Sequence, residues 1–200
     1  MSPITELIGG AKAYGWGAVG AAIGDFESIA TVTVPSGNTT TYTIVFTSIP
    51  QTYSHLQIRG IYRDIWAVSG TGEFYIKPNS SATSFNASFK WVLSGGTSGL
   101  STYGYANRGD GIFMGQGVRN GSGANYYGGF VVDILEYTNT SKYKTFRGIG
   151  GADLNGSGTA VIQSGLYQST SAISSLYIYP NGEGFAQYSK FALYGIKDPA

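Results

Sequence analysis

Few side chains in this sequence could move a proton or attack a carbonyl group. The 200 residues include a single histidine, His55, and no cysteine. General acid–base catalysis needs a positioned proton carrier, and His55 begins a predicted strand, where an exposed or hydrogen-bonded histidine is the simpler interpretation. A hydrolase triad would also need its serine on a strand–turn–helix elbow, which the pattern does not predict. We therefore expect no catalytic residue and no enzyme activity.

The acidic residues offer two alternative kinds of chemistry. A glycosidase uses two carboxylates that flank the scissile bond. By strand parity, Asp133 and Glu136 lie on opposite faces of one strand. Asp64 and Glu73 could approach each other across a hairpin, but neither pairing is specific. Calcium prefers oxygen ligands, and three occur in glycine-rich loops without EF-hand spacing: Asp110, Asp153 and Asn155. We expect no metal site and no cofactor.

The composition favours a structural or binding protein. Hydrophobic residues make up 42% of the chain, which is enough for a core. Charged residues make up only 12%, about half of the usual share. The net charge is +1 without a basic run, so nucleic-acid binding through phosphate contacts has little support. Because little charge repulsion keeps copies apart, we expect the chain to associate with itself or with a larger assembly.

The elements that must position these side chains are β-strands. Hydrophobic and polar residues alternate with period two, and turns rich in Gly, Asn, Ser and Thr separate the runs. The pattern predicts strands over residues 26–34, 41–47, 55–66, 73–77, 85–93, 112–114, 126–137, 143–148, 160–167, 173–179 and 190–196. We expect one all-β domain over residues 26–200, an antiparallel β-sandwich of the jelly-roll type. The glycine- and serine-rich residues 93–125 predict a long loop over the sandwich or over a neighbouring subunit.

Residues 1–25 have a different composition, small and apolar with many glycines. Ser2, Pro3 and Glu6 resemble the first turn of a helix, which the Gly-Gly pair that follows would end. We expect a short helical or irregular arm that anchors the domain on a neighbour; a floppy leader is the alternative. The segment lacks the features of a secretion signal, and no window is apolar enough to span a membrane. The residues expected to anchor the arm are Ile4, Leu7, Ile8, Tyr14, Trp16, Val19 and Ile23.

Tyrosine is unusually common, with 16 residues in the chain. Its ring supplies apolar area while its hydroxyl stays hydrogen-bonded, so a surface of Tyr, Asn, Gly and Ser suits both sugar stacking and protein contacts. The alternative is cross-strand aromatic packing that only stabilises the sheets. The candidates for a recognition surface are Tyr103, Tyr105, Tyr126, Tyr127, Tyr177 and Tyr179.

Three segments together resemble a known group of proteins. They read FESIATVTV at residues 26–34, IVFTSIPQTYSHLQIR at residues 44–59 and FALYGI at residues 191–196. Their order resembles that of small virion structural proteins of tailed bacteriophages, described as tail-fibre-like, appendage or head-decoration proteins. The resemblance implies a self-associating β-sandwich, usually a homotrimer, on the outside of a virion made in the host cytoplasm. It covers the two ends of the β domain and no part of residues 66–189.

Three functional hypotheses follow. The first is a non-enzymatic virion structural protein, a tail-fibre, appendage or head-decoration component that docks on the particle through residues 1–25. Its partners would be copies of itself, other virion proteins and host surface glycans, with no nucleic acid and no membrane insertion. The second is a carbohydrate-binding, lectin-like module that recognises host surface glycans through its tyrosines. The third, a polysaccharide-degrading enzyme, has the least support because neither carboxylate pairing is specific.

Overall fold

The computed structural model describes residues 26–37, 43–79, 87–94, 99–109, 111–182 and 184–198. Within these ranges the chain consists of strands, connecting turns and one 3-10 turn at Asn120–Ser122. The prediction of an all-β protein is therefore confirmed. The predicted anchoring residues, from Ile4 to Ile23, lie outside the described ranges.

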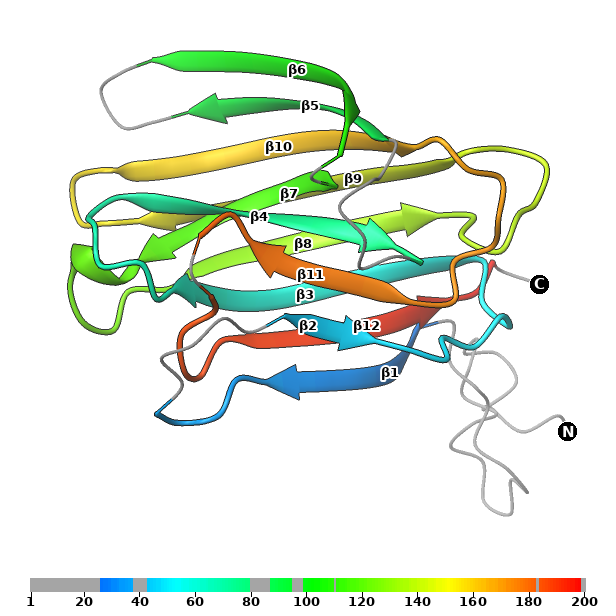
Figure 1. Ribbon diagram of the computed structural model, residues 1–200, viewed down its shortest axis with the longest axis horizontal. Coiled ribbons are helices and arrows are strands. Elements are labelled where there is room, and N and C mark those ends of the chain that lie inside the picture. The colour runs from blue at the N-terminus through cyan, green and yellow to red at the C-terminus, as the bar shows by residue number, and fades with distance from the viewer. Residues whose placement is uncertain are drawn as a thin grey trace, which may run out of the picture.

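Eight strands form one large antiparallel sheet (Figure 1). Along its third strand Leu56, Ile58 and Tyr62 are fully buried, whereas the residues between them are not. The period-two pattern of the sequence thus turns one face of this sheet toward the core. From edge to edge the order is β1 (Phe26–Thr33), β12 (Lys190–Ile196), β3 (His55–Asp64), β8 (Gly128–Leu135), β9 (Lys144–Asp153), β10 (Gly158–Tyr167), β5 (Ala87–Ser94) and β6 (Leu100–Arg108).

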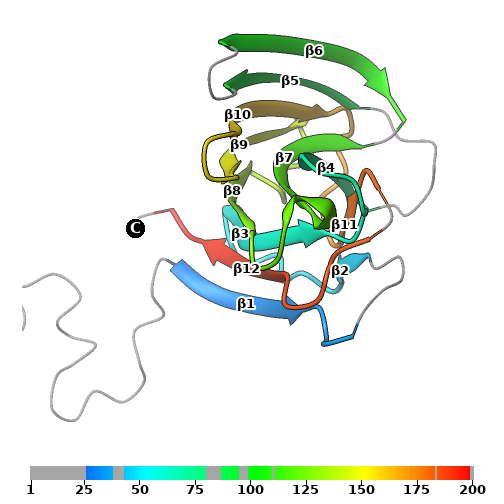
Figure 2. The same cartoon turned by 90° about the vertical axis from the view of Figure 1, so that its left-hand side faces the viewer.

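A smaller sheet lies over one face of the large sheet (Figure 2). It packs against β10, where Gln163 Nε2 donates a 2.6 Å hydrogen bond to the carbonyl of Met114. The two sheets meet where Val118 pairs in parallel with Arg63 at the end of β3, so hydrogen bonding is continuous through all 12 strands. The order of the small sheet, antiparallel throughout, is β2 (Ile44–Phe46), β11 (Leu176–Pro180), β4 (Thr71–Pro78) and β7 (Ile112–Arg119).

Eight of the strands pair like the arms of one long hairpin folded over on itself. β1 pairs with β12, β2 with β11, β3 with β8 and β4 with β7, each in antiparallel orientation. The β5–β6 and β9–β10 hairpins interrupt this series and extend the large sheet beyond β8. The nested pairs join the two ends of the described chain, with Phe26 opposite Ile196.

Aromatic rings fill the space between the sheets around Tyr62 of β3. This side chain is fully buried, and its ring lies edge-on to Phe74 and Phe185, with centroids 5.0 Å and 5.6 Å away. Phe130 and Phe191 complete the cluster. Burying one large apolar side chain contributes about 1.5–3 kcal/mol, so this cluster is a main source of the attraction between the sheets.

The prediction of a long loop over residues 93–125 is wrong, because β6 and β7 occupy most of this stretch. β7 is buried on both faces along almost its whole length, so it lacks the alternation of a half-exposed strand. Its Gly117 lies against the ring of Tyr62. Its Gly115 lies against the ring of Phe74. These glycines are needed for close packing, although in sequence they are typical of a loop.

Candidate functional site

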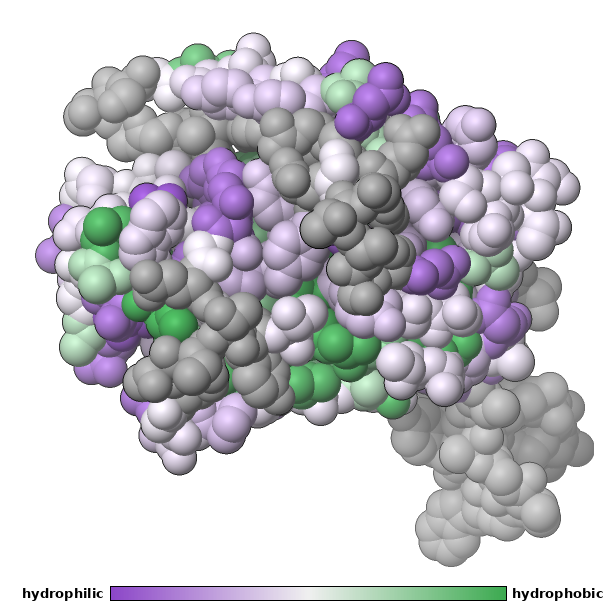
Figure 3. All heavy atoms as spheres, viewed as in Figure 1, coloured by the Kyte–Doolittle hydropathy of each residue, from purple (hydrophilic) through white to green (hydrophobic). Residues whose placement is uncertain are grey.

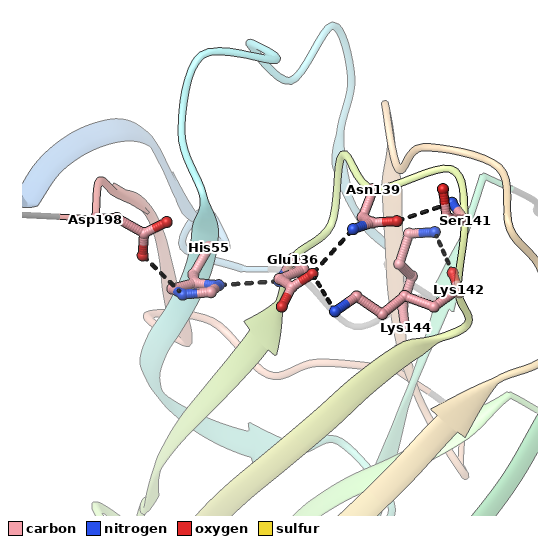
Figure 4. A network of polar contacts seen from close by, with 7 residues as sticks. All are labelled: His55, Glu136, Asn139, Ser141, Lys142, Lys144 and Asp198. Carbon is pink, nitrogen blue, oxygen red and sulfur yellow. Dashed lines mark hydrogen bonds and ion pairs between the residues drawn. The ribbon is translucent and has the colours of Figure 1, made fainter.

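His55 is held between two other elements at the end of the molecule where β1 begins and β12 ends (Figure 4). Its Nδ1 accepts a 2.9 Å hydrogen bond from the backbone N–H of Glu136. Its Nε2 lies 3.4 Å from a carboxylate oxygen of Asp198. Because Nδ1 is an acceptor, the ring proton sits on Nε2, toward that carboxylate. Both ring nitrogens thus connect parts of the fold, which supports the structural interpretation of His55.

Glu136 belongs to the same network and is bound to a lysine (Figure 4). Its Oε2 lies 2.6 Å from Lys142 Nζ and accepts a 3.0 Å hydrogen bond from Asn139 Nδ2. The hydrogen bond from Lys142 lowers the pKa of Glu136 below its usual value. A carboxyl group that is ionised at neutral pH cannot donate a proton as a general acid, which a glycosidase requires.

The other carboxylates considered for hydrolysis also have partners of their own. Asp133 forms an ion pair with Arg147 at 2.9 Å, whereas the cation beside Glu136 is Lys142. Asp64 is buried at the end of β3, and its Oδ1 accepts a 2.8 Å hydrogen bond from a backbone N–H two residues later. Glu73 accepts a 2.8 Å hydrogen bond from a tyrosine hydroxyl two residues along β4. These contacts give no support to a two-carboxylate hydrolase.

Lys144 is a buried cation that joins two loops at this end (Figure 4). Its Nζ donates hydrogen bonds to the carbonyls of Lys142 at 3.0 Å and Thr170 at 3.1 Å. Burial lowers the pKa of its ammonium group. Within the described chain no carboxylate lies at ion-pair distance from it. Its contacts connect the β8–β9 loop to the β10–β11 loop, which is a structural role.

The opposite end of the molecule carries a hollow of about 430 Å³, and Figure 2 looks onto this end. Four connections build it: the turn after β1, the end of β3, the β7–β8 loop and the β11–β12 loop. We call it the end hollow. The lining residues on which the argument depends are Arg63, Asn120, Asn125, Tyr127, Gln187 and Tyr188.

Hydrogen bonds tie the loops around the end hollow to one another. Gln187 Oε1 accepts a 2.8 Å hydrogen bond from the N–H of Gly37, and its carbonyl accepts one of 2.8 Å from the hydroxyl of Tyr127. Arg63 Nη2 donates to the carbonyls of Asn120 and Gly123 at 2.8 Å and 2.5 Å. These hydrogen bonds hold together the four chain segments that surround the hollow.

Two lining residues have a left-handed backbone that is unusual for residues other than glycine. Asn125 has φ of 69° and Tyr188 has φ of 65°. Asparagine tolerates this region, whereas a bulky side chain such as tyrosine is strained there by about 1–3 kcal/mol. Tyr188 is also 57% exposed, so its ring is held at the surface at a cost in backbone energy. Tyr188 was not predicted from the sequence, where its only signal is a place in a polar turn before β12.

The six predicted recognition tyrosines do not form one platform. Tyr103 and Tyr105 are 45% and 41% exposed, as predicted, although they lie on the edge strand β6 and not in a loop. Tyr126 and Tyr127 are half-buried in the β7–β8 loop. Of these four, Tyr127 borders the end hollow. The structure therefore brings one of them together with Tyr188.

The remaining two candidates, Tyr177 and Tyr179, are half-buried on β11 of the small sheet. The ring of Tyr179 stacks on that of Tyr75 in the neighbouring strand, with centroids 6.0 Å apart. Lys77 Nζ lies 5.1 Å from its centre. Tyr179 thus follows the alternative interpretation, cross-strand packing that stabilises the sheet.

The side that carries the small sheet has few strongly apolar areas (Figure 3). Most of its described atoms are pale in this view, because Gly, Ser, Thr and Tyr have intermediate hydropathy. Hydrophobic residues gather mainly over the part where β2 and β12 lie. This surface agrees with the low charge of the sequence.

The outer face of the large sheet is more apolar. Ile149 of β9 and Ile162 of β10 lie directly opposite each other and are 59% and 62% exposed. Val131 of β8 continues the same cross-strand row, on the other side of Ile149. In the next row on this face, Gly129 is paired with Gly151. We call these five residues the isoleucine face.

The structure and the comparisons add few other indications of function. No group of three or more acidic or histidine side chains is placed to hold a metal ion in the described part of the chain. Asp153, considered for calcium, accepts a 2.8 Å hydrogen bond from the N–H of Asn155 within its own turn. None of the helical turns among the described residues is long and apolar enough to cross a membrane. A scan of protein-family models and searches of curated proteins and of solved structures found no match to this chain.

Proposed function

We propose that this protein is a non-enzymatic structural component of a bacteriophage virion, which assembles with copies of itself through the isoleucine face. The observation that carries the proposal is the exposed pair Ile149 and Ile162 in the middle of a broad sheet. Single exposed hydrophobic residues are normal, but a contiguous apolar area on a soluble chain marks an interaction surface.

Gly129 gives this face a second property of an interface. A side chain there would meet no atom within 4 Å, and the backbone is not left-handed. The packing of the chain itself therefore does not require glycine at this position. Glycine in a strand permits close approach by another backbone, so we infer that a neighbouring subunit lies against Gly129.

Polar residues border the apolar area on one side, as in many protein interfaces. The next row toward the chain termini contains the ion pair of Asp133 and Arg147, with Ser164 beside it. Gln57 Nε2 donates a 2.6 Å hydrogen bond to the same aspartate. An apolar centre with a polar rim suits a second copy better than a lipid surface.

The free edge of the large sheet also favours self-association. β6 ends this sheet, and its nine residues include one charged side chain, Arg108, and no proline. Soluble proteins usually protect such edges with charges, prolines or bulges. With one charged residue, no proline and a register shift confined to its Arg108 end, this edge is only weakly protected and is suited to contact with another copy.

The nested strand pairing supports a virion role. We infer that β1, β2, β3, β4, β7, β8, β11 and β12 form a jelly roll, whose eight strands pair in this manner. Viral capsid proteins and lectins are among the proteins that use this arrangement. The tail-fibre, appendage and head-decoration proteins that the sequence resembles are one such use, with a homotrimer as the expected assembly and residues 1–25 as the anchor.

Light scattering after size-exclusion chromatography tests the assembly surface. We expect the full chain to elute as an oligomer, and the Ile149→Lys and Gly129→Lys variants to elute as folded monomers. Val68→Lys is the control, because Val68 is similarly exposed in the β3–β4 connection, away from this face. A wild-type chain that is monomeric at high concentration would contradict the proposal.

Mass spectrometry of gradient-purified phage particles tests the location. The chain should be present in many copies per particle, and deletion of residues 1–25 should prevent its incorporation while leaving the β domain folded. Absence of the chain from purified particles would rule out the virion assignment, whatever its oligomeric state.

A further inference from the structure

The end hollow has the composition of a sugar-binding site. Tyr127 and Tyr188 supply aromatic rings, which can pack against the C–H groups of a sugar ring while their hydroxyls stay hydrogen-bonded. Asn120, Asn125 and Gln187 supply amide groups, which both donate and accept hydrogen bonds and so match sugar hydroxyls.

The size and charge of the hollow restrict what it could bind. Its volume of about 430 Å³ lies in the lower part of the range of roughly 300–1,000 Å³ found for small-molecule sites. None of the described residues that line it is Asp or Glu, and glycoside hydrolysis usually requires two carboxylates. Its one charged lining residue, Arg63, is held by two backbone carbonyls. These features suit binding of a neutral sugar without cleavage.

The position of the hollow fits recognition of a distant surface. β1 runs from Phe26, opposite Ile196, to Thr33, close to the turn that lines the hollow. At about 3.3 Å per residue this strand separates the two ends by roughly 25 Å. Residues 1–25 join the domain at Phe26, so an anchor there would leave the hollow facing away from the particle.

We infer that the end hollow, with Tyr188 and Tyr127 as its aromatic contacts, binds a neutral sugar ring of a surface polysaccharide without cleaving it. The loops are already tied together by hydrogen bonds from Tyr127, Gly37 and Arg63, so binding requires little ordering. Tyr188 lines the hollow with a left-handed backbone and is 57% exposed, and a role of its ring in binding accounts for a strained conformation at this position. The site shares no residue with the isoleucine face and does not depend on assembly there.

Two measurements with the full chain test the site. The first is binding to an array of bacterial surface oligosaccharides, and the second is calorimetry with the neutral oligosaccharide that binds most tightly on the array. We expect Tyr188→Gly to lower its affinity by roughly tenfold, the value expected for loss of one aromatic contact. Glycine accepts the left-handed backbone, so this variant stays folded. Tyr143→Ala is the matched control, since Tyr143 is 50% exposed at the opposite end of the molecule. The affinity of this variant for the oligosaccharide should stay within about twofold of the wild-type value.

Three results would overturn the inference. The first is an array on which the wild-type chain binds no neutral glycan. The second is an equal loss of affinity in Tyr143→Ala and Tyr188→Gly, which would place binding elsewhere. The third is release of reducing ends from the bound oligosaccharide, which would show cleavage. Tyr188 lies outside the isoleucine face, so the Tyr188→Gly variant should have the same oligomer mass as the wild type. A loss of sugar binding with unchanged mass therefore concerns the end hollow alone and not the assembly proposal.

Discussion

The ring of Tyr62 on β3 occupies the space that a side chain at Gly117 of β7 would need. The tyrosine hydroxyl donates a hydrogen bond to the carbonyl of Gly72 on β4. One buried side chain thus connects the large sheet to two strands of the small sheet. The packing of the two sheets depends on a large residue on one strand and a missing side chain on the other.

We predict that Gly117→Ala destabilises the protein, because its methyl group would collide with the Tyr62 ring. Overpacking of this kind costs about 1–3 kcal/mol in the free energy of unfolding. Urea denaturation measures the loss. Val68→Ala is the control, since Val68 is 43% exposed and lies outside the isoleucine face, and it should change stability by less than about 0.5 kcal/mol. Equal losses in both variants would show that the close packing at Gly117 has no special role.

Alkaline pH should destabilise the protein through Tyr62. Burial raises the pKa of its hydroxyl well above the ordinary value of 10.0, so the unfolded chain releases this proton more readily than the folded chain. The stabilisation is complete below the unfolded pKa and is lost as pH rises above it. We expect unfolding free energies measured at about pH 8 and about pH 11 to differ less in Tyr62→Phe than in the wild type. The exposed Tyr143→Phe variant should show the wild-type difference.

Lys144→Met should destabilise the protein although it removes a buried charge. The ammonium group donates to the carbonyls of residues 142 and 170, and hydrogen bonds to a charged group contribute about 1.5–3 kcal/mol. Lys142→Met is the control, because the exposed ion pair of Lys142 with Glu136 contributes at most about 1 kcal/mol. Chemical denaturation of both variants should show the larger loss at residue 144, and the reverse order would contradict the assignment.

Tyr188→Gly should raise the stability of the protein or leave it unchanged. Its φ of 65° strains a tyrosine by about 1–3 kcal/mol but does not strain a glycine. Relief of this strain offsets the conformational-entropy cost of about 0.5–1 kcal/mol that glycine adds. The melting temperature measures the effect. Tyr143→Gly should lower stability instead, because Tyr143 does not have a left-handed backbone and glycine costs conformational entropy there. A clear loss of stability in Tyr188→Gly would show that the ring is needed for folding.

Strands with one exposed face could be predicted from the sequence, and β3 is the best example. Leu56, Ile58 and Tyr62 alternate with polar residues, and they are buried as this pattern predicts. Only residues 112–114 of β7 were predicted as a strand, because β7 is covered on both faces and its Gly115 and Gly117 are typical of loops. Their function is to make room for rings that come from other strands.

For the candidate sites too, local features could be predicted from the sequence and contacts between distant segments could not. The exposure of Tyr103 and Tyr105 was predicted from their polar, glycine-rich surroundings in the sequence, whereas their place on strand β6 was not. The end hollow was not predicted, because Arg63 at the end of β3, Tyr127 and Gln187 come from three separate parts of the chain that only the nested strand pairs bring together.

By itself the sequence determined the all-β character, the low charge and the scarcity of histidine and cysteine. Composition and period-two alternation depend only on residue types and on residues close to one another in the chain. Only the tertiary structure decided which strands are neighbours, that Ile149 and Ile162 lie opposite each other on an outer face, and that four loops enclose one hollow. Strand pairing across long sequence separations depends on how all the strands fit together, and no local pattern carries that information.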